Sequence, residues 1–172
     1  LFNINLTIHQ GEFVAIMGPS GSGKSTLLNL LGGLDQPTSG KVQIDGDDLG
    51  EYGEEQLAEL RRKKMGFIFQ RHDLCPVLTA RENIEFPVLL NDIPLEERHA
   101  RSEQLLNLVQ LADKADSLPE ELSGGQQQRI GIARALANAA SILLADAPTG
   151  NLDSATSEDI IDSLIALKQS CN

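Results

Sequence analysis

The order of apolar and polar positions divides the chain into strand-like and helix-like stretches. Alternation or short apolar runs predict strands over residues 5–8, 12–17, 41–45, 65–69 and 142–145. Apolar residues spaced three and four apart predict helices over residues 25–31, 54–64, 79–90, 95–111 and 154–168. Strand signals stop between residues 71 and 118, so we expect a helical sub-lobe at 71–118, inserted in an α/β core of residues 1–70 and 119–172.

A glycine-rich turn follows the second predicted strand. It has the spacing G-x-x-x-x-G-K-[ST] of a phosphate-binding loop, between a buried strand and a helix. Glycines allow backbone N–H groups to turn inward, and the helix aims its positive end at an anion. We expect Lys24 to reach the β- and γ-phosphates and Ser25 to ligate Mg²⁺. The candidate nucleotide-binding residues are Gly18, Pro19, Ser20, Gly21, Ser22, Gly23, Lys24, Ser25 and Thr26.

Two polar residues stand where predicted strands end. Asp146 ends the apolar run of residues 142–145, and Gln70 ends that of residues 65–69. Ligands of parallel sheets lie beyond the carboxyl ends of the strands, so Asp146 should share an edge with the glycine-rich loop and hold Mg²⁺. Gln70 can ligate the metal or place a water. A helix-capping aspartate and a polar strand end are the alternatives for these two residues.

A second predicted helix start has the features of an anion-binding site. Ser123 can cap a helix and Gln126, three residues on, can close a capping box, while Gly124 and Gly125 leave the backbone bare. A single triphosphate does not need two such helix ends, whereas two subunits placed head-to-tail would use both. An ordinary capped helix is the alternative.

Composition narrows the function classes. The chain has 172 residues and a formal net charge of −11, which argues against a nucleic-acid partner. No apolar run reaches the length of a membrane span, and no charged stretch followed by an apolar one opens the sequence, so we expect neither a membrane span nor a signal peptide in it. Cys75 and Cys171 have no metal-ligand spacing, so we expect two free thiols in a reducing cytoplasm. The chain begins at Leu1 within a predicted strand, and we expect it to be truncated at both ends.

Together these motifs resemble the ATP-binding-cassette (ABC) ATPases. The matching parts are Walker A (GPSGSGKST, Gly18–Thr26), the Q-loop (Phe69-Gln70), the signature (LSGGQ, Leu122–Gln126), Walker B (ILLAD, Ile142–Asp146) and the D-loop (Asn151-Leu152-Asp153). The fuller strings are similar to the branch of lipoprotein release, macrolide export and peptide export.

The resemblance implies a P-loop fold with a RecA-like core, a small antiparallel β part and a helical sub-lobe. It also implies a homo- or heterodimer in which each ATP, with Mg²⁺, lies between the Walker A of one domain and the signature of the other. Closure and hydrolysis then drive separate transmembrane permease subunits, with the chain at the inner face of the cell membrane. Residues 74–78 and 82–90 are our candidates for contacting the permease.

One position departs from the family. The residue after the Walker B aspartate is a glutamate in the family, where it acts as general base, and here it is Ala147. Alanine cannot accept a proton, so we expect nucleotide binding with slow hydrolysis. The histidine of the family's switch loop would lie beyond residue 172.

Three other functions stay open from the sequence. A cassette ATPase of chromosome maintenance or DNA repair would carry long coiled coils, whereas about fifty residues separate Gln70 from Leu122. A translation-type ATPase would carry two cassettes on one chain. A regulatory ATP-binding pseudo-ATPase is compatible with Ala147.

Overall fold

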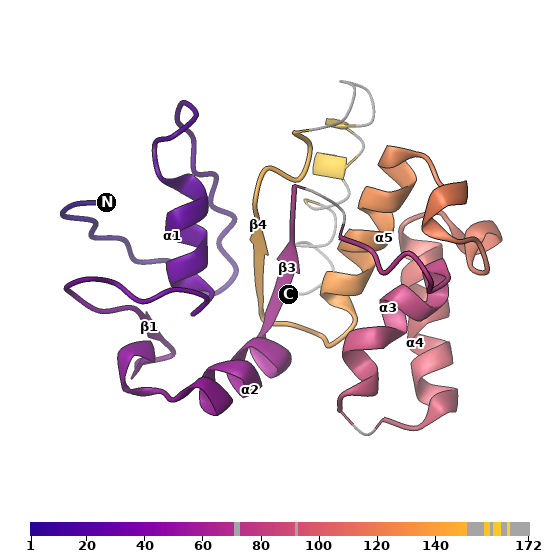
Figure 1. Cartoon of the computed structure of the whole chain (residues 1–172), viewed down its shortest axis with the longest axis horizontal. Helices are drawn as coiled ribbons and strands as arrows, with labels where there is room; N and C mark the ends of the chain where they lie inside the picture. Colours follow the sequence, from indigo (N-terminus) through magenta and orange to yellow (C-terminus); the bar gives the residue numbers. More distant parts are fainter. Residues whose placement is uncertain (71–72, 92, 151–156, 159, 163–164, 166–172) are drawn as a thin grey trace.

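The computed structural model describes residues 1–70, 73–91, 93–150, 157–158, 160–162 and 165 (Figure 1). A two-stranded sheet, β3–β4, lies between α1 on one side and α5 on the other, and α3 and α4 lie beyond α5 (Figure 1). The helices are α1 (Lys24–Leu31), α2 (Glu54–Lys64), α3 (Ala80–Leu89), α4 (Leu95–Leu108) and α5 (Gly124–Leu136). The strands are β1 (Gln43–Ile44), β2 (Asp47–Asp48), β3 (Met65–Ile68) and β4 (Ile142–Ala145), and short 3₁₀ turns cover Leu49–Glu51, Ala112–Lys114 and Pro119–Glu121.

The β3–β4 sheet is parallel and covered on both faces. Its register pairs Met65 with Ile142 and Ile68 with Ala145. Ile68 is buried in a cluster with Ile132 and Ala135 of α5. A Cβ on Gly66 would meet the Ala135 carbonyl oxygen at 2.2 Å, so only glycine lets α5 approach this strand so closely. The sheet therefore receives α5 on the face that carries Gly66 and Ile68.

The other face of the sheet receives the end of α1. A Cβ on Gly32 would lie 2.7 Å from the Phe67 ring and 3.2 Å from Leu144, so these side chains pack against the end of this helix. The helix predicted over residues 25–31 is present as α1, and none of its four leucines is fully buried. The contact of α1 with the sheet is at its carboxyl end, so the rest of the helix stays partly open.

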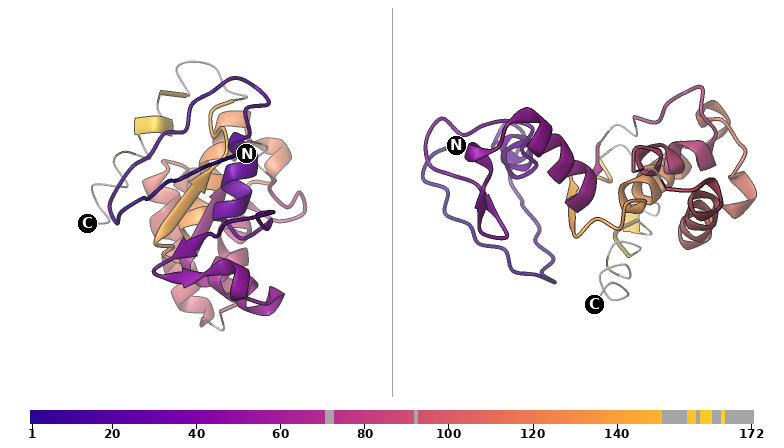
Figure 2. Two further views of the ribbon diagram at one scale, coloured as in Figure 1. Left: turned by 90° about the vertical axis from the view of Figure 1, so that its left-hand side faces the viewer. Right: turned by 90° about the horizontal axis from the view of Figure 1, so that it is seen from below.

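Two predicted strands are absent from the structure. Residues 5–8 and 12–17 form no strand, although both alternate as strands do. Leu6, Ile8, Phe13 and Val14 are each about half exposed, so no neighbouring strand or helix covers them. A strand is stabilised by the pairs it makes across a sheet, and this segment has none among the described residues. Figure 2 shows this indigo coil keeping to the α1 side of the molecule.

The strand predicted over residues 41–45 is shorter than expected and forms a hairpin. Gln43 pairs with Asp48 and Ile44 with Asp47. The turn between them is Asp45-Gly46, where φ is +54° and +93°. Positive φ at both central residues matches the twist of an antiparallel pair, and Asp-Gly supplies it at low cost. This hairpin is the small antiparallel part that the sequence predicted.

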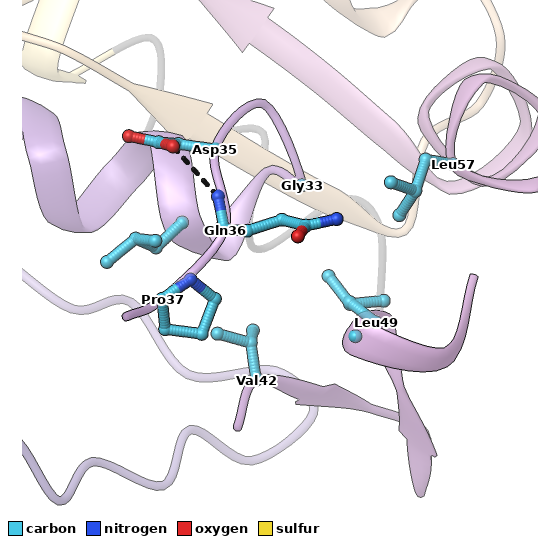
Figure 3. Close-up of a pocket in the computed structure, with 9 residues that line it drawn as sticks. Gly33, Asp35, Gln36, Pro37, Val42, Leu49 and Leu57 are labelled. Carbon is cyan, nitrogen blue, oxygen red and sulfur yellow. Dashed lines mark hydrogen bonds between the residues drawn. The ribbon is translucent and has the colours of Figure 1, made fainter. Parts of the chain in front are cut away.

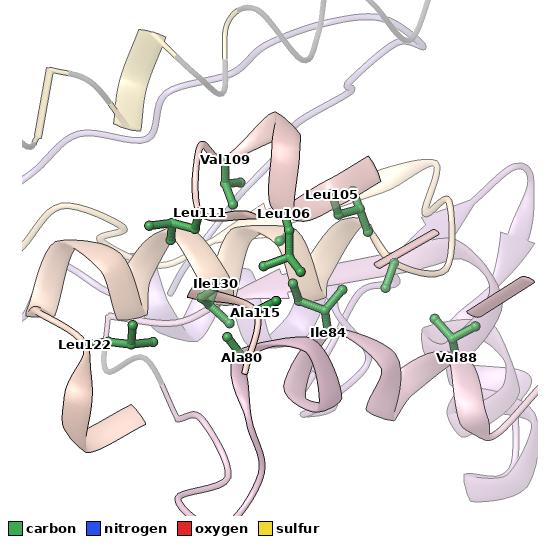
Figure 4. Close-up of a cluster of buried hydrophobic side chains, with 12 residues drawn as sticks. Ala80, Ile84, Val88, Leu105, Leu106, Val109, Leu111, Ala115, Leu122 and Ile130 are labelled. Carbon is green, nitrogen blue, oxygen red and sulfur yellow. The ribbon is translucent and has the colours of Figure 1, made fainter. Parts of the chain in front are cut away.

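The largest hydrophobic core joins α3, α4 and α5 (Figure 4). Its members share near-complete burial: Ala80, Ile84, Val88, Leu105, Leu106, Val109, Leu111, Ala115, Leu122, Ile130, Ala133 and Ala137. Ile130 and Ala133 of α5 face this cluster, whereas Ile132 and Ala135 face the sheet. Because α5 belongs to both cores, the division of the chain into a core and a sub-lobe at residues 71–118 stays a prediction.

The predicted helices agree with the structure to within one residue, except at one end and in one segment. The second helix, Glu54–Lys64, has the predicted bounds, whereas α4 ends at Leu108 rather than at residue 111, because Gln110 has a left-handed φ of +59°. The helix predicted over residues 154–168 and the D-loop lie mostly or wholly outside the described residues. Ile160 is described, and it is buried against Ile68.

Candidate nucleotide-binding site

The loop of residues 18–23 has the conformation that its glycines predict. Gly21 and Gly23 have φ of +79° and +93°, which L-residues rarely adopt. The turn closes through the Ser22 amide, which donates to the Pro19 carbonyl at 3.3 Å. A Cβ on Gly18 would lie 2.8 Å from Ser22 Oγ, so glycine is needed there for the loop to fold back. The sequence therefore forms a tight loop with bare backbone.

Lys24 and the start of α1 supply positive charge to this loop. Lys24 Nζ donates to the carbonyl oxygens of Gly18 and Pro19, both at 2.9 Å, which holds the ammonium over the loop. The helix begins after Gly23 with no side-chain cap, so the N–H groups of its first turn, which includes Ser25 and Thr26, remain available to an anion. This arrangement can hold phosphate oxygens by backbone donors, the helix dipole and a point charge.

Gln70 and Asp146 lie at the carboxyl ends of neighbouring strands, as predicted. The Asp146 amide donates to the Ile68 carbonyl at 2.9 Å, which sets the end of β4 beside the end of β3. A Cβ on Gly150 would lie 3.1 Å from Gln70 Nε2, so the Gln70 amide lies against the turn that follows Asp146. The structure brings these two residues to one edge of the sheet.

Ala147 occupies the turn directly after Asp146. Its carbonyl accepts from the Gly150 amide at 2.9 Å, and its φ is +44°, a left-handed conformation that is uncommon for alanine. Its side chain is exposed and carries no group that could accept a proton.

Ser123 and Gln126 form the predicted capping box at the start of α5. The Gln126 amide donates to Ser123 Oγ at 3.3 Å, and the Ser123 amide donates to Gln126 Oε1 at 2.9 Å. Ser123 and Gly124 are exposed, and Gly125 is half-buried, so this helix start is open to a ligand or another chain. The box orders the first turn and leaves the N–H groups of Gly124 and Gly125 facing outward.

The structure brings the glycine-rich loop and the two strand ends to the same end of the molecule (Figure 1). The amino end of α5 also lies at this end, but on the other side of the sheet, so Ser123–Gln126 does not join the loop of its own chain (Figure 1). One chain therefore carries two separate helix starts at the same end of the molecule, on opposite sides of the sheet.

The chemistry of the predicted site residues fits magnesium and a triphosphate. Ser25, Gln70 and Asp146 offer hydroxyl, amide and carboxylate oxygens, which are the hard ligands that Mg²⁺ prefers. The loop offers the bare backbone that a phosphate chain needs, since a Cβ at Gly21 would enter open space rather than protein. The Mg²⁺ and phosphate assignments of the individual residues stay predictions.

A small hollow elsewhere is not a second site. It lies between the end of α1, the start of the hairpin and α2, and Leu30, Gly33, Val42, Leu49 and Leu57 line much of it (Figure 3). Its volume is about 10 Å³, which is at the limit for one water molecule and far below that of a ligand pocket. It is a small gap between packed elements, beside the hydrogen bond that Arg61 Nη1 donates to the Gly33 carbonyl.

The sequence did not reveal two residues that hold the segment after Gln70. Asn83 is buried and bonds to the backbone of residues 75–79, and Arg134 donates to the Asp73 carbonyl. Both partners are main-chain atoms, which leave no mark in the pattern of side chains. An asparagine on the buried face of a predicted helix was the one available signal.

Comparison with known proteins identifies the family. The model described as "ABC transporter" matches residues 1–150. YknY of Bacillus subtilis, described as an uncharacterized ABC transporter ATP-binding protein, is 52% identical over 97% of this chain and 73% of its own length. The macrolide export ATP-binding/permease protein MacB of Brucella abortus is 52% identical over 98% of this chain and 26% of its own length. The lipoprotein-releasing system ATP-binding protein LolD 1 of Chlorobium chlorochromatii is 53% identical over 92% of this chain and 65% of its own length.

A solved structure agrees. The ATP-binding cassette MJ0796, in a dimeric post-hydrolysis state bound to ADP and Pi, superposes with a TM-score of 0.89, at 49% identity, over 98% of this chain and 74% of that one. Among the residues described here, no helix is long and apolar enough to cross a membrane. The predicted fold class and the similarity to macrolide-export and lipoprotein-release proteins are confirmed. The chain belongs to the ABC transporter family, as an ATP-binding domain.

Proposed function

We propose that this chain binds Mg-ATP between two copies placed head-to-tail, or between itself and a similar domain, and couples closure to a separate permease. The observation that carries the proposal is the folded glycine-rich loop, with Lys24 held over it and the strand ends of Gln70 and Asp146 at the same edge. The dimeric state of MJ0796 supports the pairing, and the names of the MacB and LolD relatives support a membrane partner.

Each residue has a role that its chemistry allows. Backbone N–H groups of residues 21–26 and the Lys24 ammonium bind phosphate oxygens. Ser25, Gln70 and Asp146 hold Mg²⁺. When bound, the ion neutralises charge that develops on the phosphates. Ser123–Gln126 of the second domain covers the same phosphates from the other side, because its exposed helix start has no phosphate loop beside it in its own chain.

We further propose that hydrolysis by this chain is slow. A general base contributes about 10²–10⁴-fold to the rate, and Ala147 cannot supply one. Binding does not depend on position 147, because the loop, Lys24, Ser25 and Asp146 are all present. The chain therefore holds ATP longer than it would with glutamate at that position.

The permease would dock on the helical region. Phe86, Leu89 and Leu90 are each more than half exposed at the end of α3, and Val77 is exposed before it. Leu74 packs against the core of α3–α5 instead, so it falls outside this surface although residues 74–78 were expected to contribute. We place the chain on the cytoplasmic side of a membrane, held there by this contact.

The test separates binding from turnover. We expect the unmodified chain and Ala147→Glu to bind ATP with similar Kd, while Ala147→Glu turns ATP over about 10²–10⁴-fold faster. Ala147→Gln is the matched control, because it has the length of glutamate but accepts no proton, and it should stay slow. Sedimentation with and without ATP reports the dimer. Equal turnover by the chain and by Ala147→Glu would contradict the role of this position.

Ala147 also favours a second candidate, a regulatory subunit that senses ATP without hydrolysing it. That reading requires ATP-dependent dimer formation in the unmodified chain, and no gain of turnover in Ala147→Glu. A gain of turnover favours a transport ATPase whose base has been lost.

A further inference from the structure

The segment that leaves Gln70 is tied to two helices. At Asp73, Arg134 Nη1 of α5 donates to the main-chain carbonyl at 2.7 Å. Asp73 has φ of +43°, an uncommon conformation for a residue with a side chain, so this turn depends on outside support. From Cys75 onward, the buried Asn83 of α3 takes over the support. Among the described residues that follow Gln70 in the chain, Asp73 is the first, and Arg134 holds it.

Arg134 is suited to hold a backbone position. Arg134 is half-buried. Its neighbours in the sequence, Ala133 and Ala135, belong to the two hydrophobic cores that α5 joins. Burial lowers the pKa of the Arg134 guanidinium from its ordinary value, while the nearby Asp73 carboxylate acts in the opposite direction. A partly desolvated cation makes a stronger bond to a carbonyl and loses more when the bond is broken.

Gln70 lies close enough to Asp73 for the hydrogen bond from Arg134 to affect its position. Asp73 follows Gln70 by three residues, so their Cα atoms are at most about 11 Å apart. The Gln70 amide lies against the turn of Ala147 and Gly150, where an added Cβ would come within 3.1 Å of it. A shift of the Asp73 turn moves the amide relative to Asp146, and misplaced ligands lose function steeply.

We propose that Arg134 is a positioning residue for Gln70: by holding the Asp73 carbonyl, it orients the Gln70 amide toward the metal and nucleotide at the edge of the sheet. This role rests on the proposed function. It also ties Gln70 to α5, the helix whose exposed start is offered to the second domain.

The test compares Arg134→Met, Gln70→Ala and the double variant. Affinity for a fluorescent ATP analogue is measured with Mg²⁺ and with EDTA, and turnover is measured in the Ala147→Glu background. We expect Arg134→Met to weaken Mg²⁺-dependent binding and turnover by about 10–100-fold, the usual cost of losing a residue that orients a ligand. Binding in EDTA should be unchanged. In the Gln70→Ala background, Arg134→Met should cost nothing further.

Arg101→Met is the matched control. Its guanidinium also donates to a main-chain carbonyl, that of Leu136 at 3.0 Å, but it joins α4 to α5. It should lower the melting temperature as Arg134→Met does and leave the Mg²⁺-dependent affinity unchanged. Arg134→Lys keeps a charged donor, so it should recover part of the Mg²⁺-dependent affinity for the ATP analogue. It replaces Arg134→Met as the test variant if Arg134→Met does not fold.

The outcomes separate two failures. Absence of ATP binding by the unmodified chain overturns the proposed function and this role with it. Normal binding by the chain, with Arg134→Met and Arg134→Lys equal to it, or losses that add to those of Gln70→Ala, overturns the positioning role alone. The same loss in Arg101→Met would show general destabilisation and also overturns it.

Discussion

At the scale of single residues, Asn83 stands out because one buried amide lies within hydrogen-bond distance of four backbone groups. Its Oδ1 accepts from the Cys75 amide at 2.7 Å, and its Nδ2 donates to the carbonyls of Cys75, Leu78 and Thr79 at 3.1, 2.9 and 3.0 Å. The side chain is 1% exposed. The Cys75 and Thr79 carbonyls also accept the backbone N–H groups of Leu78 and Asn83, so the Cys75 amide and the Leu78 carbonyl are the two groups that depend on this side chain among the contacts described.

Asn83→Ala should therefore lower the free energy of unfolding by about 2–4 kcal/mol, since each buried polar group left without a partner costs roughly 1–3 kcal/mol. Urea titration followed by circular dichroism measures the change. Asn107→Ala is the control: its amide also bonds to a main-chain carbonyl, that of Glu103, but it is exposed, and its loss should cost about 0.5 kcal/mol or less. Equal costs at the two positions would show that burial of Asn83 is unimportant.

At the scale of elements, the start of α3 has a cap that depends on charge. Glu82 accepts from the Thr79 amide at 2.8 Å and from the Thr79 hydroxyl at 2.9 Å. These two bonds, the backbone bond first, lower the pKa of Glu82 from its ordinary value of 4.5. A lowered pKa in the folded state means that the stabilisation is present above the pKa of the unfolded chain and is lost as pH falls through the lower, folded value.

Glu82→Gln should remove this part of the pH dependence, because glutamine keeps the hydrogen-bond acceptor and carries no charge. Below about pH 5, the unfolding free energy of the parent should fall more steeply with decreasing pH than that of Glu82→Gln. Urea midpoints at several acid pH values measure the slopes. Parallel slopes for the parent and Glu82→Gln would contradict the role of the cap.

The same elements show what the sequence can and cannot predict. The helix after Thr79 follows from the spacing of its apolar residues, the helix start after Ser123 from its capping box, and the loop from its glycines, because each signal acts between near neighbours. The prediction of strands at residues 5–8 and 12–17 was wrong. Alternation describes a pattern of side chains and does not reveal whether a partner strand is present. The contact of Arg134 with Asp73 joins positions 61 apart, and no local pattern records it.

At the scale of the whole molecule, the sheet lies between the two proposed half-sites. The phosphate loop starts α1 on one face, and Ser123–Gln126 starts α5 on the other, both at the same end (Figure 1). A two-fold axis would bring the glycine-rich loop of each chain opposite the α5 start of its partner. This contact would therefore occur twice in the dimer. Each site in the dimer then depends on one residue set from each chain.

This arrangement predicts complementation between two inactive variants. Lys24→Met removes the phosphate-binding charge, and Gly124→Asp places a repelling carboxylate at the exposed start of α5, where it does not destabilise the helix. In the Ala147→Glu background, neither variant alone should form an ATP-dependent dimer or turn ATP over. A 1:1 mixture should do both, since the mixed dimer has one intact site, and turnover should reach at most about a quarter of the parent if pairing is random. Two sites each built within one chain would leave the mixture as inactive as its parts, and sedimentation with ATP distinguishes the two arrangements.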